Sequence, residues 1–386
     1  MKVQVESLPE VFKEVFDFAH RYYATDVYVK EDVPVFFKLI GISGTALKIA
    51  RFYDRELPSS EEREISEYLK RGVTKGDVNG FLEVLRIQPG QEIDTSFTLL
   101  KNDKYLGRYR LNVAPADGGT VLTMRRLFSY VPHFQDDLRL PEVLAETREW
   151  SSGLVVVTGP TGSGKSTTLA SIMRYLGEDA DKARVIITVE KPIEYVFENK
   201  GAFFIQREVG RDTENFVSGI HNALRQHPDV IYVGESRTPE EIKATLMASE
   251  TGHLTFTTLH TASAWGAISR IIDVFPPDEQ PQIKTILADQ LRLVVAQRLI
   301  TTVDYAVRVV TEVLYVDEYV RQRIKEGDVK SIREYVYKGD REGRRWYSLN
   351  SELTRLVQEG FVSPETAFKV TYDPKDLKNR LGRGNV

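Results

Sequence analysis

One glycine-rich segment in the middle of the chain constrains the fold more than any other feature. The sequence reads GPTGSGKST from Gly159 to Thr167, directly after the apolar run LVVVT and directly before an apolar helical pattern. The segment fits the motif G-x-x-x-x-G-K-[ST], in which a strand leads into a phosphate-holding loop and then into a helix. This order of strand, loop and helix predicts an α/β nucleotide-binding domain.

The residue types of this loop suit a nucleoside triphosphate. Glycines let backbone N–H groups converge on phosphate oxygens, Lys165 adds a positive charge near the β- and γ-phosphates, and Ser166 can ligand Mg²⁺. We therefore predict ATP and Mg²⁺ as cofactors. Two alternatives stay open: a loop that binds nucleotide without hydrolysing it, and an accidental match. The predicted binding residues are Gly159, Pro160, Thr161, Gly162, Ser163, Gly164, Lys165, Ser166 and Thr167.

The rest of the chain divides around this loop. β-Branched runs such as PDVIYVGE and HLTFTTLH alternate with helical segments, which predicts a parallel sheet with crossover helices. Before the loop, runs such as YLGRYRLNV alternate apolar and polar residues, as in an antiparallel meander. We expect a mixed α/β N-terminal domain over 1–130, a linker over 131–152, an ATPase core over 153–300 and a helical C-terminal region over 301–386.

The segment that follows the parallel strands has a helical pattern. KTILADQLRLVVAQRLI, at 284–300, predicts a helix, and so do YVRQRIKEGD and SELTRLVQEGF further along the chain. Gly360 suits the end of a helix, and Ser363 before Pro364 suits the start of one. We therefore expect helical appendages at the C-terminal side of the ATPase core.

The composition narrows the classes of protein to consider. Of the 386 residues, 41% are apolar and 28% are charged, which is typical of a folded globular protein. A net charge of −4 gives no general attraction to nucleic acid. No apolar segment reaches the roughly 18 residues that a membrane span needs, and no export signal opens the chain. We expect a cytoplasmic protein that does not bind nucleic acid directly.

Hydrolysis of ATP also requires a carboxylate that orients Mg²⁺ or the attacking water. Glu235 ends the strand-like run PDVIYVGE, Glu190 ends VIITVE, and Glu194 follows shortly after. Because ligands bind at the carboxyl ends of parallel strands, Glu235 and Glu190 are the preferred catalytic candidates. Glu235 is also a predicted metal ligand. For Glu194 alone, simple contact with solvent is an equally good interpretation.

Two histidines stand on either side of the predicted strand in TGHLTFTTLHTA. They are His253 and His260. A histidine in such a place often has only a structural role, but two of them beside a nucleotide site suggest sensors of the γ-phosphate. No third or fourth ligand follows at zinc spacing, which argues against a zinc site.

Taken in order, a series of motifs resembles the secretion ATPase superfamily, whose members drive type IV pili and type II and type IV secretion. The motifs are GPTGSGKST, VEKPIEY, LRQHPDVIYVGESR, TGHLTFTTLHT and RIIDVFP. ATDVYV, RYRLNV and YVRQRIKEGD extend the likeness to nearly the whole chain, which is most similar to the PilT-type pilus retraction ATPases. The resemblance implies a hexameric ring, in which a PAS-like N-terminal domain of one subunit covers nucleotide bound to a RecA-like domain.

The resemblance also implies roles for individual residues. Glu190 and Glu194 match an acidic box, and Glu235 matches the Walker B glutamate. His253 and His260 match a histidine box. Arginines of the N-terminal domain reach the phosphates in such motors, and the matching strands contain Arg108, Arg110 and Arg125. For each arginine singly, a solvated strand face is an equally good interpretation.

Three positions depart from the family pattern. The acidic box, usually Glu-Asp-Pro, here reads Glu190-Lys191-Pro192. The arginine-aspartate pair after the Walker B glutamate is Arg237-Thr238, and His227 replaces an acidic residue. The first departure matters most, because the loss of a carboxylate weakens the organisation of Mg²⁺.

We predict a hexameric, Mg²⁺-dependent ATPase motor that powers pilus retraction and twitching motility together with an inner-membrane pilus platform protein. The chain has no cysteine, so it cannot build the cysteine-ligated zinc module of assembly-type motors. Two alternatives stay open: a DotB-type ATPase of type IVB secretion or conjugation, and a nucleotide-binding scaffold without turnover. We expect the protein to be peripheral to the membrane through its partner.

Overall fold

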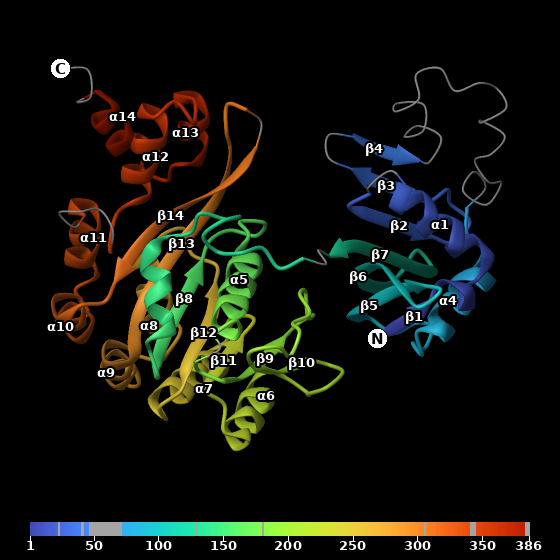
Figure 1. Cartoon of the computed structure of the whole chain (residues 1–386), viewed down its shortest axis with the longest axis horizontal. Helices are drawn as coiled ribbons and strands as arrows, with labels where there is room; N and C mark the ends of the chain where they lie inside the picture. Colours follow the sequence, from blue (N-terminus) through green and yellow to red (C-terminus); the bar gives the residue numbers. More distant parts are fainter. Residues whose placement is uncertain are drawn as a thin grey trace. The chain divides into compact units, whose positions relative to one another are not determined.

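Two separate seven-stranded sheets organise the chain (Figure 1). The computed structural model describes residues 1–21, 24–39, 42–45, 72–127, 130–179, 181–304, 306–339 and 345–382. One compact unit holds Met1–Tyr130 and Lys191–Tyr195, and the other holds Val131–Glu190 and Val196–Val386. The predicted α/β fold, with an N-terminal domain before a RecA-like ATPase domain, is confirmed.

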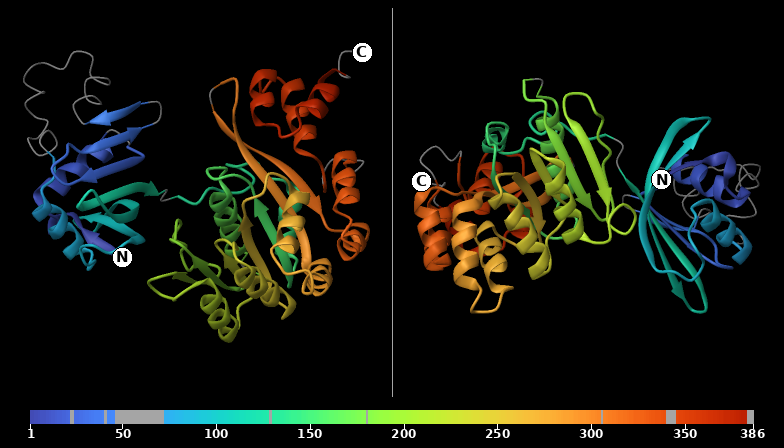
Figure 2. Two further views of the ribbon diagram at one scale, coloured as in Figure 1. Left: turned by 180° about the vertical axis from the view of Figure 1, so that it is seen from behind. Right: turned by 90° about the horizontal axis from the view of Figure 1, so that it is seen from below.

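The first unit is a sheet with helices α1 and α4 on one face (Figure 2). Its strand order is β1-β5-β6-β7-β2-β3-β4, and β5, β6 and β7 form the antiparallel meander that the alternating sequence predicts. Phe12 and Phe81, from the two helices, stack with 4.2 Å between ring centroids. The elements are β1 Lys2–Gln4, α1 Glu10–Arg21, β2 Asp26–Lys30, β3 Phe36–Leu39, β4 Ile42–Thr45, α4 Lys75–Val84, β5 Ile93–Lys101, β6 Lys104–Ala116 and β7 Gly119–Leu127.

The second unit is a sheet covered on both faces. Its strand order is β10-β9-β11-β12-β8-β13-β14, and all neighbouring pairs are parallel except β13 and β14. Helix α5 packs on one face, and α6 to α9 pack on the other. Burial on both faces explains the continuous apolar runs of its strands. The elements are the 3-10 helix η2 Glu142–Arg148, β8 Gly153–Thr158, α5 Lys165–Gly177, β9 Val185–Glu190, β10 Phe203–Glu208, α6 Phe216–Ala223, β11 Val230–Val233, α7 Pro239–Glu250, β12 Leu254–Leu259, α8 Ala264–Asp273, α9 Gln280–Gln290, β13 Leu291–Thr301 and β14 Val307–Tyr315.

The helix predicted for 284–300 is wrong over its second part. Helix α9 ends at Gln290, and Leu291 begins strand β13, which pairs with β14. The region 301–386 is therefore not helical throughout, because β14 lies in it. The residues from Leu293 to Ala296 are all buried, so the run shows no alternation of polar and apolar residues. Periodicity alone cannot distinguish such a strand from a buried helix.

Beyond β14, the described part of the C-terminal region forms the helices α10 to α14, as the sequence pattern predicts. Helix α12 ends before Gly360, whose φ is 76°, and α13 begins at Pro364 after the capping residue Ser363. No helix in the described parts of the chain is long and apolar enough to cross a membrane. The helices are α10 Glu318–Glu326, α11 Val329–Lys338, α12 Leu349–Gln358, α13 Pro364–Val370 and α14 Pro374–Gly382.

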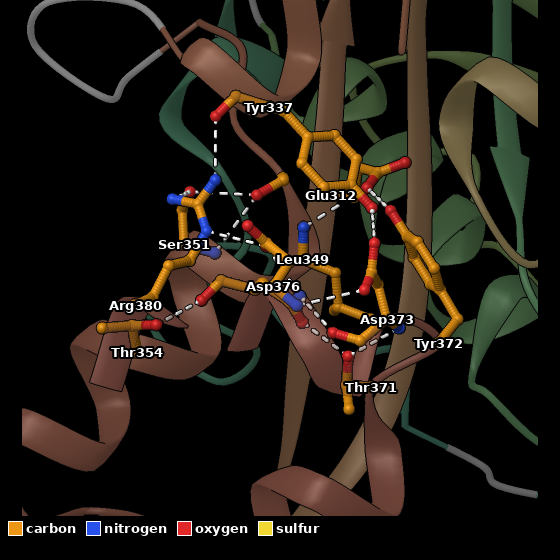
Figure 3. A network of polar contacts seen from close by, with 12 residues as sticks. Glu312, Tyr337, Leu349, Ser351, Thr354, Thr371, Tyr372, Asp373, Asp376 and Arg380 are labelled. Carbon is orange, nitrogen blue, oxygen red and sulfur yellow. Dashed lines mark hydrogen bonds and ion pairs between the residues drawn. The ribbon is translucent and has the colours of Figure 1, made fainter. Parts of the chain in front are cut away.

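A buried carboxylate joins the last helices to the sheet (Figure 3). Glu312, on β14, is fully buried and accepts hydrogen bonds from the backbone N–H of Ala264 at 2.7 Å and of Leu349 at 3.3 Å. These residues begin α8 and α12, so one carboxylate caps two helices. The hydroxyl of Tyr372 donates to the same carboxylate. Burial raises the pKa of Glu312, and these hydrogen bonds oppose that rise.

Candidate functional site

The phosphate-binding loop follows the carboxyl end of β8. The strand ends at Thr158 and helix α5 begins at Lys165. Gly159 has a φ of 150°, and a Cβ at this position would lie 2.4 Å from the carbonyl oxygen of Gln297. Gly164, directly before the helix, has a φ of 84°. The loop therefore has a backbone shape that requires glycine at both of its ends.

Lys165 is folded over this loop. Its side chain is buried, and its Nζ donates hydrogen bonds to the carbonyl oxygens of Gly159 at 2.9 Å and of Pro160 at 3.0 Å. The loop thus holds the ammonium group beside its own backbone. This arrangement places a positive charge where the N–H groups of a loop and a helix N-terminus attract phosphate.

A glutamate and a histidine meet at the carboxyl ends of two adjacent parallel strands. Glu235 follows β11, His260 follows β12, and Val233 pairs with Thr257 between them. The Nε2 of His260 lies 3.6 Å from the Oε2 of Glu235. Arg237 donates to the same oxygen, with its Nε at 2.8 Å and its Nη2 at 2.7 Å. The second unit therefore brings two predicted site residues together and adds a guanidinium group.

His260 lies beside the phosphate-binding loop, because Leu259 pairs with Thr158, and this position affects the pKa of His260. Burial is the largest cause and lowers the pKa of His260, and the positive charge of Lys165 lowers it further. The carboxylate of Glu235 raises it in part, and Arg237 again lowers it. The imidazole is therefore mainly neutral near pH 7. A neutral ring can donate from one nitrogen and accept at the other.

Glu190 lies at the same edge of the second sheet. It is the last residue of β9 and is buried, and its Oε1 accepts a hydrogen bond from Thr188 Oγ1 at 2.6 Å. A Cβ at Gly234 would lie 3.3 Å from the Cα of Glu190, so the ends of β9 and β11 approach closely. Glu194 belongs to the Lys191–Tyr195 segment of the first unit. It is not a member of the group that the second unit assembles.

His253 lies at the opposite end of β12 from His260. Its backbone carbonyl accepts a hydrogen bond from the N–H of Gly153, at the start of β8, whereas the phosphate-binding loop follows the end of β8. At about 3.3 Å per residue, the two ends of these strands are about 17 Å apart. The ring of His253 instead contacts the carbonyl oxygen of Ala248 at 3.2 Å. Within one chain, this geometry does not support a phosphate-sensing role for His253.

The three predicted arginines lie on the first sheet and have partners there. Arg110 and Arg125 are opposite each other on β6 and β7. The Nε of Arg110 donates to Asp94 at 2.9 Å, and the Nε of Arg125 donates to Asp26 at 2.6 Å. Arg108 is buried and donates to hydroxyl groups of β5. Arg110 and Arg125 would therefore contact a nucleotide either through their other N–H groups or by the exchange of a carboxylate partner for a phosphate.

The oxygen donors at the edge of the second sheet fit Mg²⁺. This ion prefers oxygen ligands and is commonly held by one or two side chains together with substrate phosphates. Ser166, in the first turn of α5, and Glu235 offer a hydroxyl and a carboxylate. Among the described residues, no group of three or more His, Cys, Asp or Glu side chains could hold a metal ion. Ser166 and Glu235 thus suit an ion whose remaining ligands are nucleotide phosphates and water.

Two neighbours of the site were not among the predicted site residues. Arg237 appeared in the sequence only as a departure from the family pattern, because its contact with Glu235 depends on the turn after β11. Gln297 contacts the phosphate-binding loop from β13 and donates to the carbonyl oxygen of Ser163 at 2.6 Å. The apolar run of this segment does not distinguish a strand from a helix, so the sequence does not place Gln297 beside the loop.

Comparison with known proteins identifies relatives that cover both units. The family model described as Type II/IV secretion system protein matches residues 94–375. The type IV pilus retraction ATPase PilT of Pseudomonas aeruginosa is 34% identical over 364 residues, which are 94% of this chain and 99% of that protein. The crystal structure of the pilus retraction motor PilT with bound ADP has a TM-score of 0.76 at 31% identity, and covers 96% of this chain and 99% of its own. The Legionella pneumophila ATPase DotB has a TM-score of 0.75 at 27% identity, with the same coverage.

Proposed function

The chain belongs to the type II/IV secretion system protein family as an ATPase of the PilT type, and from that premise we propose that it powers retraction of a type IV pilus. The observation that carries the proposal is the meeting of three groups at one edge of the second sheet. Glu235 lies beside His260, and His260 follows Leu259, which pairs with Thr158 directly before the phosphate-binding loop of Lys165. This arrangement suits the cleavage of a terminal phosphate.

In the proposed mechanism, the loop and Lys165 bind the β- and γ-phosphates of ATP. Glu235 or Glu190 positions the attacking water and receives its proton, and neutral His260 contacts the γ-phosphate. Ser166 and Glu235 would hold Mg²⁺, which when bound would neutralise charge on the phosphates. Binding and release of nucleotide then drive the movement of one unit against the other.

The assembly that we propose is a ring of six copies in the cytoplasm, which acts on a platform protein of the pilus in the inner membrane. In this ring the first unit covers nucleotide bound to a second unit. Arg110 and Arg125 would there exchange Asp94 and Asp26 for phosphate oxygens. Support comes from the similarity to pilus retraction motors over nearly the whole chain.

Phosphate release by the purified full chain tests the catalytic part of the proposal. Release with ATP and Mg²⁺ is expected, and chelation of Mg²⁺ should abolish it. Lys165→Ala and Glu235→Gln should each lower the rate by at least about 100-fold, because the first removes the positive charge on the phosphates and the second removes the carboxylate proposed to act on the water and Mg²⁺. Lys369→Ala, at a surface pair with Glu365, is the matched control. Wild-type rates in both site variants would reject the assignment of the site.

Complementation tests the proposed client. The gene should restore twitching motility to a pilated bacterium that lacks its retraction ATPase, and the Lys165→Ala form should not. The DotB-type alternative is supported by the TM-score of 0.75 with DotB. Restoration of a DotB-deficient secretion system, without restoration of twitching, would favour that alternative. Nucleotide binding without any phosphate release would instead favour a scaffold.

A further inference from the structure

The base of the phosphate-binding loop is formed by a residue far away in the sequence. Gln297 lies on β13, which runs parallel to β8, and its neighbour Ala296 pairs with Thr158. Gln297 is therefore the first residue beyond the last paired position, beside Gly159. Its side chain is only 1% exposed.

The loop packs directly against this residue at both of its ends. A Cβ at Gly159 would lie 2.4 Å from the backbone carbonyl oxygen of Gln297, and a Cβ at Gly164 would lie 3.4 Å from its Nε2. Between these points the Nε2 donates a hydrogen bond of 2.6 Å to the carbonyl oxygen of Ser163. The only side-chain donor of Gln297 is thus directed at the backbone of the loop.

This hydrogen bond determines the direction of a neighbouring N–H group. The C=O of Ser163 and the N–H of Gly164 belong to one planar trans peptide, so they point in opposite directions. Gly164 has a φ of 84° and, as a glycine, tolerates a wide range of backbone conformations, including the reverse orientation of this peptide. The sequence of the loop therefore permits two orientations of the Ser163–Gly164 peptide. The hydrogen bond from the amide of Gln297 selects one of them. With the carbonyl turned toward β13, the N–H of Gly164 turns away from β13.

Packing alone does not account for the amide group. Among the described residues, the buried Oε1 of Gln297 and the buried Oγ of Ser163 have no hydrogen-bond partner. Unpaired buried polar atoms reduce stability, and an apolar side chain of similar shape would avoid that loss. The donor function of Nε2 is what an apolar side chain could not supply.

We propose that Gln297 is a positioning residue for nucleotide binding, which holds the Ser163–Gly164 peptide with its N–H available to a phosphate oxygen of ATP or ADP. The inference rests on the proposed nucleotide-binding function of the loop. Gln297 itself touches the loop and not the nucleotide. Its loss therefore weakens phosphate binding and leaves the groups that cleave the bond in place.

Two substitutions test this role. Gln297→Met keeps the length of the side chain without the donor, and Gln297→Glu replaces the donor with an acceptor that opposes the Ser163 carbonyl. The KM for ATP and the Kd for ADP are expected to rise by about 10-fold in Gln297→Met and by about 100-fold in Gln297→Glu. The kcat at saturating ATP should stay within about threefold, because the N–H contact is made equally in the ground state and the transition state.

The matched control is Gln282→Met on the exposed surface of α9, which should leave KM and Kd unchanged. Unchanged ADP affinity in both Gln297 variants, or a fall in kcat at constant KM, would overturn the inference. If Lys165→Ala abolishes ADP binding while Gln297→Met keeps the wild-type affinity, the role of Gln297 is rejected and the proposed function is not. Absence of ADP binding to the wild-type chain would instead reject the proposed function.

A measurement on the wild-type chain covers the case in which the variants fail to fold. Hydrogen exchange at the amide of Gly164 is compared with and without saturating ADP. Exchange is expected to slow by at least about 10-fold, because the N–H becomes a donor to phosphate. Equal exchange in both samples, with ADP binding shown by calorimetry, would overturn the proposed orientation of this peptide.

Discussion

The imidazole of His260 lies 3.6 Å from the carboxylate of Glu235, at the ends of two adjacent parallel strands. The pair is asymmetric, because Arg237 binds the carboxylate oxygen that faces the ring. Lys165 adds a further positive charge on the side of the loop. Burial is the largest cause that lowers the pKa of His260, and the charges of Lys165 and Arg237 lower it further against the opposing effect of Glu235, so the histidine works as a neutral group.

The rate of ATP hydrolysis should depend on the protonation state of His260. As the pH falls below about 6.5, the ordinary pKa of histidine, His260 becomes protonated and the kcat of ATP hydrolysis should fall. His260→Asn should be slower at pH 7.5 and should lose this acidic limb. The measurement is phosphate release between pH 5.5 and 8.5. An identical acidic limb in wild type and variant would assign the titration to another group.

His260 should also make the folded protein less stable at acidic pH. The folded-state pKa of His260 is below its unfolded value, so the unfolded chain binds more protons between the two values. The contribution is complete above about pH 6.5 and is lost as the pH falls through the folded-state pKa. The melting temperature of the wild type should therefore fall more between pH 7 and pH 5 than that of His260→Asn. An equal fall in both proteins would contradict the assigned direction.

Removal of the Arg237 side chain should change the Mg²⁺ concentration that ATP hydrolysis requires. Its guanidinium occupies Oε2 of Glu235, the carboxylate proposed to hold the ion. Arg237→Gln should therefore lower the Mg²⁺ concentration for half-maximal hydrolysis by about threefold to tenfold, since a competing cation is gone. Titration of Mg²⁺ at constant ATP measures this. Arg225→Gln, an exposed arginine on the same unit, is the control, and an unchanged Mg²⁺ requirement in Arg237→Gln would rule out the competition.

Asp26 should restrain Arg125 in the absence of nucleotide. Asp26→Asn removes the charge that holds the guanidinium on the first sheet, so stability should fall by about 1 kcal/mol. Affinity for ADP should rise severalfold, because the arginine no longer needs to leave a carboxylate. Asp117→Asn, at the exposed pair with Lys30 on the same sheet, should change neither quantity. Loss of stability with constant ADP affinity would show that Asp26 only supports the fold.

Glu312 should be far more important for stability than a surface carboxylate. Glu312→Ala leaves two buried N–H groups without an acceptor, so the free energy of unfolding should fall by about 3 kcal/mol. Tyr372→Phe removes one donor and should cost about 1 kcal/mol. Chemical denaturation measures both. Glu365→Ala, at a fully exposed pair, should have no measurable effect, and equal stability of Glu312→Ala and Glu365→Ala would contradict this role.

Much of the site follows from the sequence, because its residues stand at strand ends. Glu235 and His260 follow apolar strands, Lys165 ends the loop that follows β8, and the carboxyl ends of parallel strands meet at one edge of a sheet. The same argument fails for His253. A strand has two ends, so residues that flank it in the sequence lie at opposite edges, and the seven-residue separation of His253 and His260 becomes about 23 Å in space.

The contact of Gln297, on β13, with the phosphate-binding loop could not be predicted from the sequence. The run from Leu293 to Ala296 is buried on both faces and carries no alternation, so its pattern does not separate strand from helix. Without the strand, nothing places Gln297 beside Ser163 across 134 positions of sequence. The ion pairs of Arg110 and Arg125 were equally hidden, because they depend on the register of neighbouring strands.

The carboxylate on β14 also limits how this chain can be recombined with its relatives. A chimera that exchanged residues 349–382 for a foreign C-terminal segment would import a new first turn for α12 and a new residue in place of Tyr372. The acceptor at Glu312 would stay behind in the host, still bound to α8. A functional graft therefore has to carry position 312 with it, although 36 residues separate that position from the junction.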